Sequence, residues 1–199
     1  MRPFLFSLLF VFSLQAFGQK KLIVVGDSLT EGYGVAKEAA FPFLLEKKIT
    51  TELKKNYQVV NSGISGATTA SAVSRIKWVS KQKPDVILLA LGANDGLRGL
   101  KLEDSERNLS AAVEYSRSQN VKIILGGLYM PPNYGADYTK KFAQMYQNIG
   151  KKYKVPLIPF ILDKVAGDPK YNLADGIHPN EAGHKIIADT IFQAIKAEL

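Results

Sequence analysis

The chain has 199 residues, of which 46% are hydrophobic and 22% charged, a composition that suits one globular domain with a sizeable core. Its formal net charge is +8, and the lysines lie in helix-like segments, so solvated helix faces explain the charge better than a nucleic-acid or membrane partner does. The sequence contains no cysteine, which excludes a disulfide framework, a metal–thiolate site, a lipid-modified N-terminal cysteine and a cysteine nucleophile.

Residues 1–18 are typical of a secretory signal peptide. Arg2 supplies the positive start, residues 4–14 are an apolar run broken only by serines, and small residues stand at positions −3 and −1 of a cleavage point after residue 18. The run is too short to span a membrane, and it lacks the amphipathic period of a buried helix. We therefore expect an exported protein, periplasmic or secreted, whose mature domain covers residues 19–199.

The first predicted strand covers residues 22–25, a short apolar run rich in β-branched residues. It leads into the turn Gly26-Asp27-Ser28, so a serine stands just past the end of the strand. In an open α/β sheet, chemistry takes place outside the carboxyl ends of the strands. Ser28 is therefore a candidate nucleophile, although Ser28 or Thr30 could equally well do no more than cap the helix that follows.

Strands and helices alternate along the rest of the chain. The further strands are predicted at residues 57–60, 85–91, 121–125 and 156–159, and the helices at 41–55, around Val73, Ile76 and Val79, at 103–119, at 138–153, and from the N-cap Asn180 to the C-terminus. This alternation predicts an α/β fold of three layers, α/β/α, in which a five-stranded parallel sheet has right-handed crossovers and helices on both faces. We find no internal repeat, linker or second domain.

A parallel sheet would bring polar residues from distant parts of the chain to one edge. His178 follows the last strand and is the candidate base for Ser28, because a serine hydroxyl is a poor nucleophile until a base takes its proton. Asp175, three residues earlier, can accept a hydrogen bond from the other ring nitrogen and so fix the tautomer. A surface histidine beside a helix cap is the alternative for His178. His184, in the last helix, is expected to be structural or exposed.

A tetrahedral oxyanion needs hydrogen-bond donors that are already in place. Three groups qualify, each of them just past a predicted strand: the backbone N–H of Ser28, the backbone N–H of Gly66 and the side-chain amide of Asn94. Gly66 suits a close approach of the backbone because it has no side chain. Asn94 could instead serve only the turn in which it stands.

These turns resemble the sequence blocks of the SGNH hydrolases, also called the GDSL esterases and lipases. The matching segments are Gly26-Asp27-Ser28-Leu29, Ile64-Ser65-Gly66, Gly92-Ala93-Asn94-Asp95 and Asp175-Gly176-Ile177-His178-Pro179, in that order. The resemblance runs from about residue 21 to the C-terminus. It implies a flavodoxin-like fold that needs no cofactor or metal. It also implies a catalytic Ser28, Asp175 and His178 and an oxyanion hole built from Ser28, Gly66 and Asn94, with Gly63 as the rival of Gly66.

Three further segments, residues 94–99, 132–135 and 155–160, are similar to a multifunctional branch of that family whose members act as acyl-CoA thioesterases, lysophospholipases and arylesterases. Ala67 departs from this branch, where an acidic residue is expected. The resemblance implies a monomeric serine esterase that forms an acyl-enzyme on Ser28. Its substrates would be small-molecule acyl esters and thioesters, including lysophospholipids, with no nucleic-acid partner and no stable insertion into a membrane.

The sequence also allows alternatives to this function. A carbohydrate O-acetyl esterase of the same family is the nearest alternative, because the sequence does not reveal the shape of the binding groove. A non-catalytic binding protein would have no need for the serine, histidine and aspartate together. A metal hydrolase could use Asp27, Asp95, Asp175 and His178 as ligands. A P-loop is excluded because residues 26–32 contain no lysine.

Overall fold

The structure is a computed structural model that describes residues 18–199. The predicted signal peptide therefore lies outside the described residues, apart from Gly18. No helix within the described part of the chain is long and apolar enough to cross a membrane.

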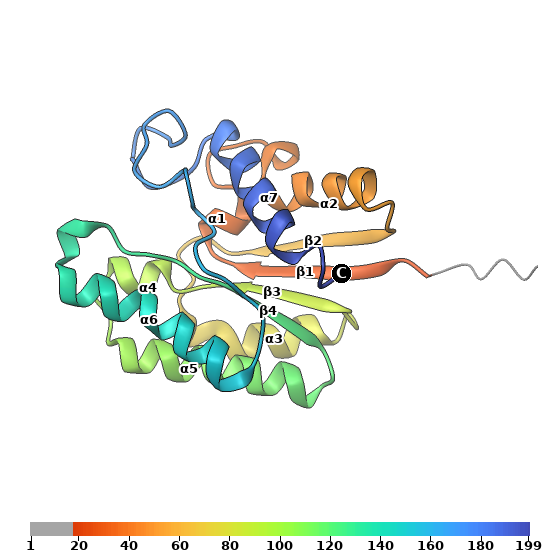
Figure 1. Cartoon of the computed structure of the whole chain (residues 1–199), viewed down its shortest axis with the longest axis horizontal. Coiled ribbons are helices and arrows are strands. Elements are labelled where there is room, and N and C mark those ends of the chain that lie inside the picture. Colours follow the sequence, from red (N-terminus) through yellow and green to blue (C-terminus); the bar gives the residue numbers. More distant parts are fainter. Residues whose placement is uncertain (1–17) are drawn as a thin grey trace, which may run out of the picture.

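One parallel sheet forms the centre of the molecule, with its strands in the order β2-β1-β3-β4-β5 (Figure 1). The strands are β1 (Lys20–Gly26), β2 (Tyr57–Gly63), β3 (Val86–Ala90), β4 (Lys122–Gly126) and β5 (Leu157–Ile158). β1 pairs on both sides, so that its last residue, Gly26, lies opposite Gly63 of β2 and Ala90 of β3. The turn that carries Ser28 therefore begins at an interior strand of the sheet, with a neighbouring strand on either side.

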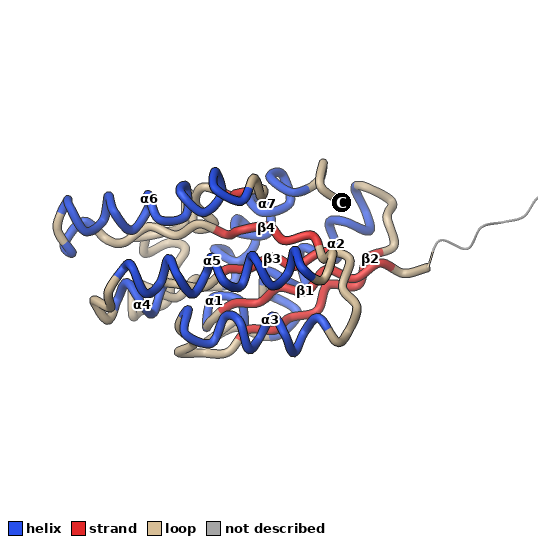
Figure 2. The backbone as a smooth tube through the Cα atoms, turned by 90° about the horizontal axis from the view of Figure 1, so that it is seen from below, coloured by secondary structure: helices blue, strands red, loops and turns tan. Residues whose placement is uncertain are grey.

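Helices cover both faces of the sheet. They are α1 (Ser28–Glu31), α2 (Phe41–Glu52), α3 (Ala72–Ser80), α4 (Ala93–Leu97), α5 (Leu102–Ser118), α6 (Ala136–Tyr153) and α7 (Glu181–Ile195), with short 3-10 turns η1 (Lys37–Ala39), η2 (Thr69–Ser71) and η3 (Pro132–Tyr134). α2 and α7 lie on one face (Figure 1), and α3, α5 and α6 lie side by side on the other (Figure 2). The predicted three-layer fold with a five-stranded parallel sheet is confirmed.

The apolar strands explain why the sheet is central. β3 is buried along its whole length, and residues 22–25 of β1 are fully buried. Parallel strands covered by helices on both faces need continuous apolar runs rather than alternating ones, and these two strands supply them. β5 is shorter than the predicted 156–159, because a proline at each end of that segment has no N–H to donate to the ladder.

Two predicted helices are shorter in the structure, and two short helices were not predicted. The last helix, predicted to run to the C-terminus, ends at Ile195. The helix predicted at 41–55 ends at Glu52, because Lys54 takes a left-handed conformation, with φ of 54°, that a helix cannot continue. The short helices α1 and α4 were not predicted. With four and five residues they carry no readable apolar period, although they hold Ser28 and Asn94.

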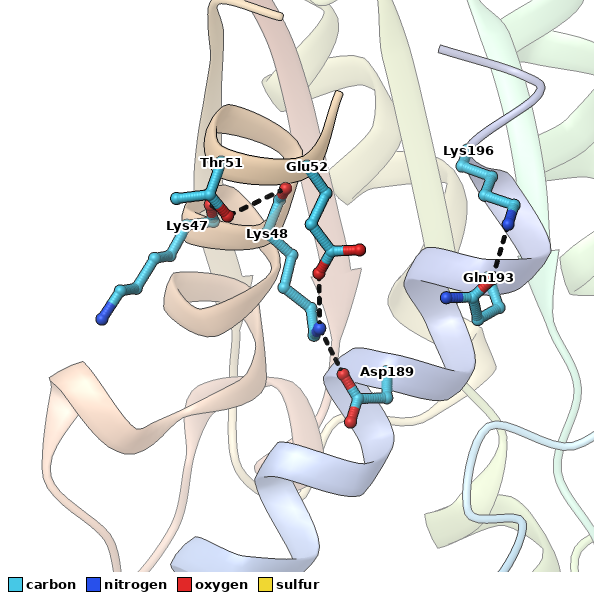
Figure 3. Close-up of polar contacts among 7 residues, drawn as sticks. All are labelled: Lys47, Lys48, Thr51, Glu52, Asp189, Gln193 and Lys196. Carbon is cyan, nitrogen blue, oxygen red and sulfur yellow. Dashed lines mark hydrogen bonds and ion pairs between the residues drawn. The ribbon is translucent and has the colours of Figure 1, made fainter. Parts of the chain in front are cut away.

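A polar network on the outer surface links α2 to α7 (Figure 3). The Nζ atom of Lys48 lies 2.8 Å from Glu52 on its own helix and 2.6 Å from Asp189 of α7. The same ammonium lies 5.5 Å from the centre of the Phe192 ring. Because these charges are partly exposed, each pair contributes less than about 1 kcal/mol. The network therefore adds little to the stability of this contact, and the buried side chains of the two helices supply most of it.

His184 joins the same two helices from the inside. Its side chain is fully buried, and its Nδ1 atom accepts a hydrogen bond from the backbone N–H of Phe41 at 3.2 Å. That N–H belongs to the first residue of α2, where no partner exists within the helix. Among the described residues the Nε2 atom has no hydrogen-bond partner. Burial lowers the pKa of His184 to about 4, so the ring is neutral and structural, one of its two expected roles.

Replacing His184 with asparagine should remove an acid sensitivity of the fold. The pKa of His184 lies near 4 in the folded protein and near 6.5 when unfolded, so the unfolded chain binds an additional proton between these pH values. The wild-type free energy of unfolding should therefore fall by up to about 3 kcal/mol from pH 6.5 to pH 4, relative to His184→Asn. Asparagine can keep the hydrogen bond from Phe41. Urea titrations at several pH values measure the difference, and parallel curves for the two proteins would contradict the assignment.

Candidate active site

The end of β1 and the start of α1 fix the position of Ser28. Asp27 is the N-cap of α1, and its Oδ1 atom accepts from the backbone N–H of Leu29 at 3.0 Å. The capping residue is thus Asp27 rather than Ser28 or Thr30, and Ser28 is the first residue of the helix. Gly26 is required here, because a Cβ atom at this position would lie 1.9 Å from the hydroxyl of Thr30. Because Asp27 supplies the cap, the Ser28 side chain does not cap α1.

The structure brings Ser28, His178 and Asp175 into one hydrogen-bonded chain. The Nε2 atom of His178 lies 3.0 Å from the Ser28 hydroxyl, although the two residues are 150 positions apart. The Nδ1 atom of the same ring lies 2.7 Å from Oδ2 of Asp175. Both distances are those of normal hydrogen bonds. The structure therefore brings together the three residues predicted from the sequence, with the imidazole of His178 between the Ser28 hydroxyl and the Asp175 carboxylate.

The loop that carries Asp175 is held by its own backbone. Oδ1 of Asp175 accepts from the backbone N–H groups of His178 and Ile177, each at 3.0 Å. These two bonds, together with the bond to the imidazole, lower the pKa of Asp175 to about 2. The backbone N–H of Leu173 donates to the carbonyl of His178 at 2.7 Å and closes the loop. Asp175 is therefore an ionised acceptor with little freedom to turn away from the ring.

Tyr33 is a neighbour of His178 that the sequence analysis missed. Its ring centre lies 4.5 Å from that of the imidazole, with the planes inclined by 40°, and about half of the tyrosine side chain is exposed. An aromatic face at this distance also stabilises a positively charged ring. The aromatic residue just after Gly32, one turn past the serine, was the available signal for this contact.

The oxyanion candidates differ in how free their donors are. The Ser28 N–H opens α1 and has no acceptor within that helix. One hydrogen of the Asn94 amide donates to the carbonyl of Ala67 at 3.0 Å, which leaves the second hydrogen of that amide available. The N–H of Gly63 already donates to the side chain of Asn61 at 2.9 Å, so Gly63 is the weaker rival of Gly66. Gly66 itself lies beside the guanidinium of Arg98, with φ of 77°.

Two buried charged groups lie directly behind the serine. Asp27 is fully buried, and the loss of hydration raises its pKa to about 6. Arg75, from α3, donates to the carbonyl of Gly26 at 2.7 Å and to the carbonyl of Ser62. This guanidinium therefore joins the carboxyl ends of β1 and β2. Sequence reasoning had no signal for either role, because both depend on contacts between segments far apart in the chain.

An apolar cavity of about 470 Å³ opens from the Ser28 hydroxyl. It is lined mainly by side chains from the loops that follow β4 and β5: Leu128, Tyr129, Met130, Pro131, Pro132, Phe160, Leu162 and Ile177, with Leu29, Asn94, Leu97 and His178 among the other lining residues. The rings of Tyr129 and Phe160 stack at 4.5 Å on its wall. Such a cavity suits an apolar chain attached to the reacting carbon.

No group of three or more potential metal ligands comes together within residues 18–199. The four residues considered for a metal hydrolase do not form one cluster, because only Asp175 and His178 are bonded to each other. Asp175 bonds to His178, whereas Asp27 caps α1. Asp95 accepts from Thr69.

Comparison with known proteins gives consistent results. The model of the GDSL-like lipase/acylhydrolase family matches residues 24–186. The thioesterase 1/protease 1/lysophospholipase L1 of Escherichia coli strain K12 is 36% identical over 195 residues, which cover 98% of this chain and 91% of that protein. The arylesterase of Vibrio mimicus is 34% identical over 198 residues, 98% of either chain. The crystal structure of TesA matches with a TM-score of 0.87 and 33% identity, covering 90% of this chain and all of that one.

Proposed function

Since the chain belongs to the GDSL-like lipase/acylhydrolase family and is therefore a hydrolase of carboxylic ester and thioester bonds, we propose that it acts through an acyl-enzyme on Ser28. The observation that carries this proposal is the hydrogen-bonded chain from the Ser28 hydroxyl through His178 to Asp175. A serine with a base in reach, and a base held by a carboxylate, is the arrangement that activates a hydroxyl nucleophile.

In the acylation step, the Ser28 oxygen attacks the carbonyl carbon while its proton passes to Nε2 of His178. Asp175 stabilises the imidazolium through the bond at Nδ1, and the Tyr33 ring adds a favourable contact. The negative charge on the carbonyl oxygen is met by the N–H groups of Ser28 and Gly66 and by the Asn94 amide. The attack produces a tetrahedral intermediate. When this intermediate collapses, the bond between the carbonyl carbon and the oxygen or sulfur of the leaving group breaks. The alcohol or thiol leaves with the proton from His178.

In the deacylation step, a water molecule takes the place of the leaving group. His178 removes a proton from this water as it attacks the acyl-enzyme, and the same donors receive the second oxyanion. Collapse then breaks the bond to Ser28, which recovers its proton from His178, and the carboxylic acid is released. The neutral form of the imidazole begins and ends the cycle.

The proposed substrates are small-molecule acyl esters and thioesters, including lysophospholipids. The apolar cavity beside Ser28 supports an acyl chain rather than a bare acetyl group, since an acetyl group would leave most of the cavity unfilled. The similarity to proteins named as a thioesterase and lysophospholipase, and as an arylesterase, supports the same range of leaving groups.

Export is a further part of the proposal, and it rests on the sequence of residues 1–18. If the full-length chain is expressed in a Gram-negative host, its exported form should begin at Gln19, which intact mass and N-terminal sequencing measure. Deleting residues 4–14 should retain the protein in the cytoplasm. A wild-type chain that stays in the cytoplasm with Met1 in place would contradict export without affecting the proposed chemistry.

A fluorophosphonate probe should label Ser28 alone, because only a serine with a base in reach attacks phosphorus at a useful rate. His178→Ala should abolish labelling, and Asp175→Asn should lower kcat by up to about 10⁴-fold because the ring is then held in the wrong tautomer. Asp163→Asn, an exposed aspartate in the loop after β5, is the matched control and should keep wild-type activity. Peptide mapping of the adduct identifies the serine. Full esterase activity in Ser28→Ala would overturn the acyl-enzyme proposal.

The length of the acyl chain should set the rate until the cavity is filled. In a series of p-nitrophenyl esters from acetate to palmitate, kcat/KM should rise by up to about fourfold for each methylene that becomes buried, and then level off. Leu162→Trp, at the cavity wall, should shift the optimal acyl chain, the shortest one that reaches the maximal kcat/KM, to a shorter length. Leu53→Trp, at a partly buried leucine of the α2 C-cap, is the control and should leave the optimum unchanged.

The same series separates this function from its nearest alternative. A carbohydrate O-acetyl esterase would show its highest kcat/KM with acetylated sugars and no gain with chain length. An optimum at the acetyl ester that Leu162→Trp does not change would therefore reject the acyl-chain assignment while leaving the serine esterase chemistry in place.

A further inference from the structure

Three side chains of the α4 segment hold the loop that follows β2. The Asn94 amide donates to the carbonyl of Ala67 at 3.0 Å, and the guanidinium of Arg98 donates to the carbonyl of Gly66 at 3.2 Å. Between them, the carboxylate of Asp95 accepts from the backbone N–H of Thr69 at 2.9 Å and from its hydroxyl at 2.5 Å. Two proposed oxyanion donors, the Asn94 amide and the Gly66 N–H, thus belong to two segments that these contacts join.

Of these three side chains, Asp95 is the one whose contact with the loop after β2 is buried. Its side chain is 3% exposed, whereas Asn94 is partly exposed and Arg98 is exposed. The carboxylate has no ion-pair partner among the described residues, and Ser105 of α5 supplies a further hydrogen bond at 3.1 Å. Thr69 is fully buried, and its hydroxyl also accepts from Asn108 at 3.2 Å. A buried carboxylate without a cation is tolerated only when donors satisfy it, so this geometry has little freedom.

We propose that Asp95 is a positioning residue for the oxyanion hole: its bonds to Thr69 set the separation between the Asn94 amide on α4 and the Gly66 N–H in the loop after β2. The proposal rests on the proposed function, in which both groups receive the oxyanion. Asp95 itself faces away from the reacting atoms, since its oxygens are used by Thr69 and Ser105. It therefore acts through its neighbours and not on the substrate.

The expected effect is on turnover rather than on binding. Oxyanion donors contribute only when charge develops on the carbonyl oxygen, so a donor that is displaced lowers kcat. The acyl chain, in contrast, is held mainly by cavity walls that the loops after β4 and β5 provide, and Asp95 is not among the residues that line the cavity. A change at Asp95 should therefore leave KM almost unaltered.

Asp95→Asn is the decisive variant, because an amide has one acceptor oxygen in place of two and would turn an NH₂ group toward a donor. It should lower kcat for a p-nitrophenyl ester by about 10- to 100-fold, with KM within about twofold of wild type. Asn94→Ala alone should cost about 10²–10³-fold. Once the Asn94 donor is gone, its displacement no longer matters and only the displacement of the Gly66 N–H remains, so the double variant should lose clearly less than the product of the two single losses. A merely structural role would instead multiply the two losses.

Substitutions at Thr69 keep the test decisive if Asp95→Asn fails to fold. Thr69→Val removes the hydroxyl donor and should lower kcat by several-fold, and Thr69→Ser should restore it. Ser116→Ala, which removes another buried hydroxyl hydrogen bond, on α5, is the matched control and should reduce thermal stability without lowering kcat. Wild-type kcat in Asp95→Asn or Thr69→Val, or full multiplication in the double variant, would overturn the proposal. A wild-type enzyme without esterase activity would instead reject the proposed function.

Discussion

The hydrogen bond between the Ser28 hydroxyl and His178 joins two ends of the chain, and much of the architecture holds those ends in place. β1 lies between β2 and β3, so the serine turn leaves the sheet from an interior strand that is held on both sides. His178 precedes α7, whose buried His184 contacts the first residue of α2. The 3.0 Å distance between His178 and Ser28 therefore depends on the packing of α7 against α2 as well as on the loop that carries His178.

The surroundings of Ser28 differ between its two sides. On the side of the proposed oxyanion donors, buried polar and charged groups such as Asp95 and Arg75 fix backbone segments to one another. On the acyl side, apolar side chains from the loops after β4 and β5 form a cavity wall. Hydrogen bonds are directional and fix donors precisely, whereas apolar contacts are not and tolerate chains of varied length. This division matches the two demands of ester hydrolysis, a fixed geometry for charge and a tolerant fit for the acyl group.

Much of the fold and part of the site could be predicted from the sequence, for physical reasons that are visible in particular residues. Continuous apolar runs such as 22–25 identify buried parallel strands, and topology then brings Ser28 and His178 to one edge. The helices α1 and α4 could not be predicted, because so few residues carry no period. The contacts of Arg75 with the Gly26 carbonyl and of Tyr33 with His178 could not be predicted either, because only the folded chain brings these residues together.

The choice between Gly63 and Gly66 shows where sequence reasoning reaches its limit. Gly63 is the last residue of β2 and Gly66 lies just beyond it, and neither spacing nor composition separates the two in the sequence. The difference comes from Asn61, whose side-chain oxygen accepts from the Gly63 N–H, while a Cβ atom on Gly63 would lie 2.1 Å from the backbone of Glu31. Gly63 is thus a glycine because α1 packs against it, and Gly66 is a glycine because the turn there requires a positive φ. Packing therefore explains Gly63 and turn geometry explains Gly66, and of the two N–H groups it is that of Gly63 which Asn61 already uses.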